Sequence, residues 1–188
     1  MTIDHAKFFQ EYRNTFGSLK QDQVNGLIFL LAAFDADARW SDPRHMAYAL
    51  ATIKHETADT FEPISERGSD AYLSKYWTNG NLRRNLGNIE PADAQKYKGR
   101  GYVQITGRSN YTRFGLVNHP EMALEPETAF EIMTKGMHEG IFTGKRLADY
   151  INEKTDYTQA RRIINRLDRA GLIASFAREF EKILKEAA

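Results

Sequence analysis

The chain has 188 residues, a formal net charge of +1 and no cysteine. This length suits one domain with a sizeable core, or at most two small lobes. The 41% hydrophobic content excludes an intrinsically disordered chain. A net charge so close to zero gives no general attraction to nucleic acid or to an anionic membrane. The lack of cysteine excludes disulfides and thiolate chemistry, and it is typical of a protein that folds in a reducing compartment.

The first predicted elements are two helices. The N-terminal sequence MTIDHAKFFQEYR has neither the basic nor the apolar region of a secretion signal, so we expect the chain to be made without one. Phe8, Tyr12 and Phe16 recur at every fourth position and predict the first helix. The apolar run at residues 26–34 predicts a second helix that lies in the core, because a membrane span needs about 20 such residues.

A third helix is predicted to begin at Pro43 and to reach Glu56. Asp42 is suited to cap this helix, and proline is favoured at the first helical position. Apolar residues at helical spacing between Met46 and Ile53 give the segment a buried stripe. Glu56 therefore falls in the last turn of a core helix.

Residues 60–115 are irregular, aromatic and basic. Residues 60–101 show little periodicity, and a long stretch of this kind is usually functional or disordered; its aromatic residues argue against disorder. Residues 70–115 carry eight basic and three acidic residues, which predicts a local basic surface suited to an anionic substrate. The alternating segment YVQIT, residues 102–106, predicts a short strand with Gln104 and Thr106 on one side.

Helical patterns return in the last third of the chain. PETAFEIMTKGMHEG predicts a helix closed by Gly140, and helical patterns continue in GKRLADYI and TQARRIINRLDRAG. The final helix is predicted to pack against the core, because from Arg169 onward it has four basic and three acidic residues and lacks a strongly cationic face. The whole pattern predicts a single, mainly α domain over residues 1–188.

Two glutamates are candidates for acid–base chemistry. Hydrolysis of a glycosidic bond needs one protonated carboxyl and one ionised carboxyl. Glu56, at a helix end against the core, is suited to the first role, and Glu66, on a loop beside Arg67, to the second. Taken without context, two solvated glutamates, with Glu66 paired to Arg67, are the more common meaning of such a pair.

A zinc site is the alternative for the same segment. The sequence HE at residues 55–56 begins the zincin motif, which needs a second histidine four residues after the first. Position 59 is aspartate, so that ligand pair is missing. We expect no catalytic metal and no cofactor, and His55 is interpreted as a partly packed residue at the helix end.

The most informative segment is YKGRGYVQITGRSNYTRFG, residues 97–115. The glycines on either side of Arg100 permit a tight turn or the close approach of a ligand. Gln104, Thr106 and Asn110 offer the amide and hydroxyl groups that hold water and bind sugars. A structural hairpin followed by a helix capped at Ser109 is the alternative.

These motifs together resemble glycoside hydrolase family 19. The resemblance rests on HET at a helix end, a second acid ten residues on, GRGYVQITGRSNY and ARRIINR, and it covers about residues 43–169. The family holds plant-type chitinases and the related endolysins of bacteriophages and prophages. The resemblance implies a mainly α, lysozyme-like fold with a loop-rich middle and at most a short β element. It also implies an inverting mechanism without metal or cofactor.

The resemblance assigns roles by position. It implies that Glu56 is the general acid, that Glu66 is the general base and that Thr106 holds the attacking water. It implies substrate contacts for His55, Tyr102, Gln104, Asn110, Tyr111, Arg162 and Asn165. The chain departs from the pattern at one point: the chitinases usually read INGG followed by an acid, whereas here Arg166 replaces the first glycine and Asp168 comes early.

The resemblance and the composition favour a muramidase-type endolysin. We expect it to hydrolyse the β-1,4 bond between N-acetylmuramic acid and N-acetylglucosamine in peptidoglycan. We expect a monomer in the host bacterial cytoplasm that acts on the periplasmic wall after release by a holin, with no nucleic-acid partner and no stable membrane anchor. A chitinase, a lytic transglycosylase and a non-catalytic wall- or nucleic-acid-binding module remain alternatives.

Overall fold

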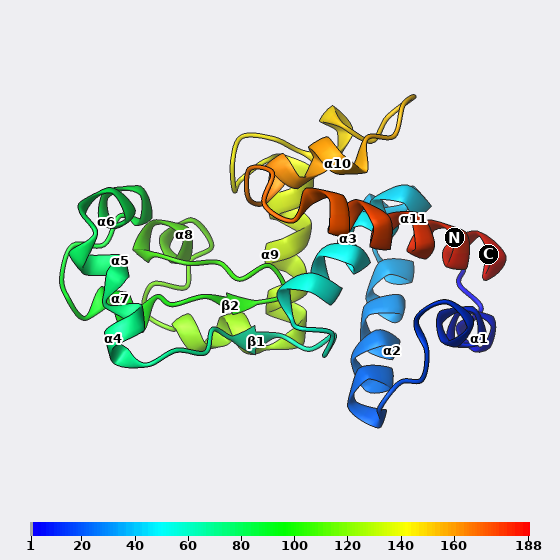
Figure 1. Cartoon of the computed structure of the whole chain (residues 1–188), viewed down its shortest axis with the longest axis horizontal. Coiled ribbons are helices and arrows are strands. Elements are labelled where there is room, and N and C mark those ends of the chain that lie inside the picture. Colours follow the sequence, from blue (N-terminus) through cyan, green and yellow to red (C-terminus); the bar gives the residue numbers. More distant parts are fainter. Residues whose placement is uncertain (1) are drawn as a thin grey trace. The chain divides into compact units, whose positions relative to one another are not determined.

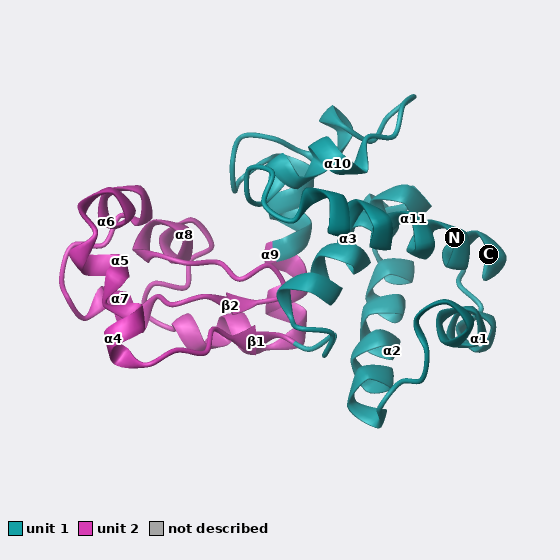
Figure 2. Ribbon diagram, in the orientation of Figure 1, with its two compact units in different colours: residues 1–62, 133–188 teal, residues 63–132 magenta. Residues whose placement is uncertain are grey.

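The computed structural model describes residues 2–188, which form two compact units (Figure 2). Within the described residues, unit 1 comprises residues 2–62 and 133–188, and unit 2 comprises residues 63–132. The division falls within one helix, α9 (Pro126–Glu139), which the sequence predicts correctly as ending before Gly140. The predicted single catalytic domain stays a prediction.

Unit 1 is built from long helices (Figure 1). Its elements besides the end of α9 are α1 (His5–Phe16), α2 (Gln21–Ala36), η1 (Ala38–Trp40), α3 (Pro43–Glu56), η3 (Leu147–Asp149), α10 (Tyr157–Ala160), η4 (Arg161–Ile163) and α11 (Ala170–Glu186). No helix within residues 2–188 is long and apolar enough to cross a membrane.

The core of unit 1 surrounds α3. Every residue from Met46 to Ile53 is buried, and α3 packs against α11. The face of α11 that includes Phe180 is buried, and the Phe180 ring contacts the rings of Tyr12 and Phe61. This burial confirms that the last helix packs against the core. It also removes apolar area from water, which is the main stabilising contribution in such a bundle.

The predicted bounds of α3 are confirmed. The Asp42 side chain accepts a hydrogen bond of 2.9 Å from the Arg44 N–H, and Pro43 occupies the first helical position. The backbone N–H groups of a helix's first turn have no partner within the helix. Asp42 accepts a hydrogen bond from one of them, and Pro43 has no N–H to leave without a partner. The helix ends at Glu56, as predicted.

Unit 2 contains short elements. They are β1 (Ile64–Ser65), α4 (Asp70–Leu73), α5 (Lys75–Thr78), α6 (Gly80–Leu86), α7 (Asp93–Lys96), β2 (Arg100–Gly101), α8 (Arg108–Arg113) and η2 (Pro120–Leu124), followed by the start of α9. The strands are antiparallel, with Ile64 opposite Gly101. Ser69 and Asn79 cap α4 and α6 through their side chains. Helices this short cannot show the periodicity that sequence analysis relies on.

Three local predictions are wrong. The strand predicted for residues 102–106 is a turn, because Gly101 and Gln104 have φ of +87° and +53° and reverse the chain. The continuous helical pattern predicted for residues 158–171 is broken by left-handed Arg166 and Arg169, and GKRLADYI forms only η3. Ser109 lies inside α8, which begins after Gly107. The fold class, mainly α with a loop-rich middle and a short β element, is confirmed.

Candidate active site

In unit 1, the sharp turn after α3 fixes the position of Glu56. Thr57 ends the helix, and Ala58 and Asp59 follow with φ of 50° and 69°. This left-handed conformation costs a non-glycine residue about 1 kcal/mol, so the surrounding contacts must hold it. The Thr57 hydroxyl provides two of them: it donates to a carbonyl of α3 at 2.8 Å and accepts from the Phe61 N–H at 3.2 Å.

Glu56 forms an ion pair with a buried arginine. Nη1 of Arg161 lies 2.8 Å from Oε1 of Glu56, and the side chains are only 2% and 17% exposed. The N–H directions do not meet hydrogen-bond geometry, so the contact is electrostatic. Arg161 Nε donates to the Asp168 carbonyl at 2.9 Å. Burying a guanidinium costs several kcal/mol unless it is paired, so Glu56 and Arg161 stabilise each other's charge.

Tyr48 forms part of the same buried surroundings. Its side chain is 0% exposed, and its ring stacks parallel to that of Tyr157 at 6.3 Å. Burial raises the pKa of the Tyr48 hydroxyl, while the charge of Arg161 acts in the opposite direction. The hydroxyl therefore stays neutral, and the charges in this part of unit 1 are those of Glu56 and Arg161.

In unit 2, neighbouring groups hold Glu66 directly. The Tyr76 hydroxyl donates to Oε1 at 2.8 Å, and the Gly99 N–H donates to Oε2 at 3.1 Å. Lys75 Nζ lies 3.9 Å from Oε1. Burial and the contact with Glu66 raise the pKa of Tyr76, so its hydroxyl keeps the proton that it donates. The predicted alternative, in which Glu66 pairs with Arg67, is not what the structure shows.

The two glycines around Arg100 bring the backbone close to Glu66. A Cβ atom on Gly99 would lie 3.0 Å from Oε1 of Gln104 and 3.2 Å from Oε2 of Glu66. Gly101 has φ of +87°, and a Cβ there would lie 2.9 Å from the Ala123 carbonyl oxygen. The backbone here lies close to other parts of the protein, and the approach of a ligand to these glycines stays a prediction.

A chain of hydrogen bonds joins Gln104, Thr106 and Asn110. Gln104 Nε2 donates to the carbonyls of Ile64 and Gly101, at 2.9 and 2.8 Å. The Thr106 hydroxyl donates to the Gln104 carbonyl at 3.0 Å, and Asn110 Nδ2 donates to the Thr106 carbonyl at 2.8 Å. These side chains build the loop after β2, and the Thr106 oxygen keeps lone pairs that can accept a hydrogen bond from water.

The other predicted substrate contacts have varied positions. Tyr102 and Tyr111 are 1% and 0% exposed, and the Tyr111 hydroxyl donates to the Lys98 carbonyl. Both therefore have packing positions. His55 is half-buried in the last turn of α3, whereas Arg162 and Asn165 are exposed on the segment after Arg161. Their contacts with a substrate stay predictions.

The sequence did not identify Arg161 as the partner of Glu56. The substrate contact predicted in ARRIINR is the neighbouring Arg162, which is exposed and donates to the Gln159 side chain at 2.7 Å. In the structure Ala160, Arg161 and Ile163 are buried, whereas Arg162 is exposed, and the sequence alone gives no signal of this difference.

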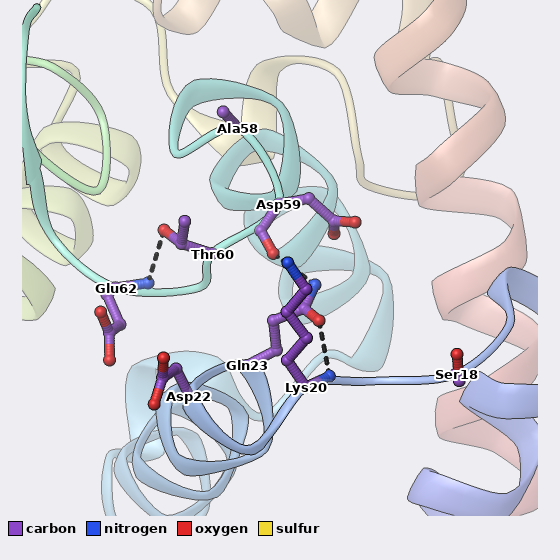
Figure 3. Close-up of a pocket in the computed structure, with 8 residues that line it drawn as sticks. All are labelled: Ser18, Lys20, Asp22, Gln23, Ala58, Asp59, Thr60 and Glu62. Atoms are coloured by element: carbon purple, nitrogen blue, oxygen red, sulfur yellow. Dashed lines mark hydrogen bonds between the residues drawn. The ribbon is translucent and has the colours of Figure 1, made fainter.

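Unit 1 also contains a pocket of about 490 Å³, whose lining residues are drawn in Figure 3. Two hydrogen bonds stabilise the segments around this pocket. The Lys20 N–H donates to Oε1 of Gln23, and the Glu62 N–H donates to the Thr60 hydroxyl oxygen. The pocket is lined by Ser18, Lys20, Asp22, Gln23, Ala58, Asp59, Thr60 and Glu62. None of the predicted site residues lines it. Within residues 2–188 there is also no group of three or more histidine and carboxylate side chains able to hold a metal ion.

Comparison with known proteins identifies the fold. A search found no family model that matches the chain. Chitinase C from Streptomyces griseus HUT6037 superposes with a TM-score of 0.65 at 21% sequence identity, over 98% of this chain and 77% of the chitinase. The chain shares its fold with chitinase C. A chitinase C mutant with glutamine in place of glutamate gives a TM-score of 0.64 at 20% identity, over the same shares of both chains.

The likeness to chitinase C confirms the predicted lysozyme-like helical fold class. Because almost the whole of this chain superposes, both units belong to that fold. An identity near 20% shows the fold alone, and fold does not determine chemistry. The chemistry must be argued from Glu56, Glu66 and the groups that hold them.

Proposed function

We propose that the protein is a glycoside hydrolase that cleaves peptidoglycan glycan strands as a muramidase-type endolysin. The observation that supports it most is the fold shared with chitinase C across 98% of the chain. On that fold, Glu56 and Glu66, the two glutamates of the sequence resemblance, each have a structured environment. The basic character of residues 70–115 favours a substrate with carboxylates.

The proposed reaction is an inverting hydrolysis with one role for each carboxyl. Glu56 must carry a proton when substrate is bound, although Arg161 stabilises its ionised form, and it donates that proton to the glycosidic oxygen as the bond to the anomeric carbon breaks. Glu66 accepts a proton from a water molecule, whose oxygen forms the new bond on the opposite face of the sugar. The hydrogen bonds from Tyr76 and Gly99 orient Glu66 before the reaction, and the Thr106 hydroxyl is suited to hold the water.

The proposal includes a setting for this activity. The protein acts as a monomer, without metal or cofactor, on the periplasmic wall. It is made in the host bacterial cytoplasm and released by a holin, with neither a nucleic-acid partner nor a stable membrane anchor. Among the substrate contacts, Gln104, Asn110, Asn165 and Arg162 offer polar groups to the sugars, and His55, Tyr102 and Tyr111 support the surrounding surface.

Mass spectrometry of the fragments released from purified peptidoglycan tests the proposal. Fragments with a reducing N-acetylmuramic acid end are expected from the wild type. Glu56→Gln and Glu66→Gln are expected to lower the rate by at least about 100-fold while the variants stay folded. Glu62→Gln, an exposed glutamate between the two in sequence, serves as the control and should keep the wild-type rate. Near wild-type activity of Glu56→Gln would show that Glu56 is not the general acid.

A chitinase is the second candidate, because both solved structures with this fold named above are of chitinase C. Rapid cleavage of N-acetylglucosamine oligomers together with intact peptidoglycan would favour it. A lytic transglycosylase would instead release anhydro-muramic ends and would tolerate Glu66→Gln. Binding without any new reducing ends would indicate a wall-binding module.

A further inference from the structure

The end of α3 is closed by a backbone turn that favours glycine. The Asp59 N–H donates to the Lys54 carbonyl at 2.8 Å, and the Ala58 N–H donates to the His55 carbonyl at 3.3 Å. These two bonds form a Schellman motif, in which glycine is the usual residue at the left-handed position. Here that residue is Ala58, with φ of +50°, and Asp59 follows with φ of +69°. The turn after Glu56 is therefore unfavourable in isolation and depends on side-chain contacts.

An ion pair joins the two ends of this turn. Lys54 Nζ lies 2.5 Å from Oδ1 of Asp59, and their side chains are 10% and 47% exposed. A Schellman motif commonly carries an apolar contact between these two positions, so a pair of charges replaces apolar packing here. The Tyr12 hydroxyl accepts from Lys54 Nζ at 3.0 Å and donates to Asp59 at 3.4 Å. Burial and the charge of Asp59 raise the pKa of Tyr12, so its hydroxyl keeps the proton that it donates.

Four aromatic rings surround the Lys54 ammonium. Its Nζ lies between 4.7 and 5.6 Å from the ring centres of Tyr12, Phe16, Phe61 and Phe176. Rings at this distance attract a cation, but the attraction is smaller than the cost of removing an ammonium from water. The carboxylate of Asp59 supplies the remaining compensation. The buried lysine therefore holds Asp59, and with it the turn, in one place.

Helix α2 also holds this turn. Gln23 Nε2 donates to the Asp59 carbonyl at 2.7 Å. A Cβ atom on Gly26 would collide with the carbonyl of Phe61, so the lack of a side chain at Gly26 lets α2 approach the turn closely. Contacts from α1, α2 and α3 thus converge on the few residues that follow Glu56.

We propose that the Lys54–Asp59 ion pair is a latch that holds the turn after α3 and so positions Glu56 for proton transfer. Glu56 is the last residue of the helix and lies between the two members of the pair in sequence. A misplacement of about 1 Å can lower a catalytic rate by about 100-fold. Lys54 and Asp59 are positioning residues, because they act through Glu56. The inference rests on the proposed function and deepens it, since it identifies what fixes the general acid.

Steady-state kinetics of the full chain on solubilised peptidoglycan test the latch. Asp59→Asn and Lys54→Met are each expected to lower kcat roughly tenfold and to change KM less than twofold. Because both variants break the same pair, K54M/D59N should lose little more than either alone. Asp59→Glu keeps the carboxylate and should keep kcat within about threefold of the wild type.

Two controls separate positioning from charge and from stability. Glu179→Gln removes a carboxylate that pairs with Lys182 at 3.0 Å on α11, and it should keep the wild-type kcat. Ile151→Ala lowers stability at the opposite end of α3, because Ile151 is buried and its carbonyl contacts His45 in the first turn. It should also keep kcat while the protein is folded. A tenfold fall of kcat in either control would reduce the effect of the pair to general charge or stability and overturn the proposal.

Amide hydrogen exchange tests the turn without substrate. The N–H groups of Thr57 and Asp59 donate to carbonyls of α3, and both should exchange at least about tenfold faster in D59N because the turn opens more often. The Ala177 N–H, in the middle of α11, reports global unfolding and serves as the reference. Unchanged exchange at the turn would overturn the latch. Faster exchange with wild-type kcat in every variant would also overturn it, because the turn would then not position Glu56.

The half-exposed carboxylate of Asp59 keeps the test decisive. K54M leaves that carboxylate in contact with water and no ammonium among the rings, so this variant is expected to fold. If D59N does not fold, the kinetics and the amide exchange of K54M decide the proposal.

The latch and the proposed function fail separately. Wild-type protein that releases no fragments from peptidoglycan, together with faster exchange at the turn in K54M and D59N, would remove the proposed function and leave the pair as the latch of the turn. Wild-type protein that cleaves peptidoglycan, with exchange and kcat unaffected in both variants, would keep the function and remove the latch.

Discussion

The two units hold their candidate catalytic carboxyls by different physical means. Unit 1 places Glu56 against Arg161, a buried cation from a distant part of the sequence. Unit 2 surrounds Glu66 with a tyrosine hydroxyl and a backbone N–H, while its cation, Lys75, lies 3.9 Å away and is 34% exposed. Glu56 and Glu66 are almost equally exposed, 17% and 18%, so the difference lies in the cations: Arg161 is 2% exposed and Lys75 is 34% exposed. A counter-charge that is buried contributes more to stability than one that water screens.

The largest expected difference concerns the two cations. Arg161→Met should lower the free energy of unfolding by about 3 kcal/mol, because Glu56 then keeps a largely buried charge without a partner. Lys75→Met should cost less, about 0.5–1 kcal/mol, because its pair with Glu66 is long and partly exposed, and the variant also removes the contact of Nζ with the Tyr72 ring, 3.3 Å from the ring centre. Urea denaturation of both variants measures the two values. Similar losses would show that the two environments do not differ as described.

Acid pH should destabilise unit 1 through His138. Burial, with His45 and Arg39 nearby, lowers its pKa from 6.5 to about 4. The unfolded chain therefore binds the proton more readily, so stability is complete above pH 6.5 and falls as the pH drops toward 4. The full shift corresponds to about 3.4 kcal/mol. Because His138 is only partly buried and water screens its charge, we expect a smaller loss, about 2 kcal/mol. Denaturation at several pH values would measure it.

His138→Leu should remove most of this acid sensitivity. His119→Asn is the control, because the His119 side chain is 69% exposed and should leave the pH profile unchanged. An unchanged profile in His138→Leu would assign the acid sensitivity to other groups.

Tyr76→Phe tests the hydrogen-bonded environment of Glu66. The variant removes the 2.8 Å donor to Oε1, which should cost about 1 kcal/mol of stability and lower kcat roughly tenfold with little change in KM. Steady-state kinetics on solubilised peptidoglycan separate the two constants. A roughly tenfold rise of KM with unchanged kcat would indicate that Tyr76 contacts the substrate and does not position Glu66.

Gly99→Ala should have a small effect on stability, below about 1 kcal/mol, because the neighbouring side chains need to move only slightly. The added methyl group pushes Glu66 from its backbone donor, so kcat should still fall several-fold. Ser65→Ala, a change in the adjacent strand, serves as a control. Unchanged kcat in Gly99→Ala would show that this donor does not position Glu66.

The helices that carry their own signals follow from local sequence. Asp42 and Pro43 set the start of α3, and the apolar spacing of α1, α2 and α11 predicts their buried faces. The groups that approach Gly99 and Gly101 include Glu66 and Ala123, which are distant in sequence, so the glycines alone did not predict which groups approach them. Helix caps and periodicity act over a few residues, so the sequence contains them directly.

What the sequence by itself determined is therefore the mainly helical fold class, the end of α3 at Glu56 and the position of Glu66 in the following loop. Only the tertiary structure decided that residues 102–106 turn instead of extending, and that Arg161, not its neighbour Arg162, meets Glu56. The physical reason is that burial and long-range pairing depend on which segments pack together, and adjacent arginines in the chain carry no mark of that difference.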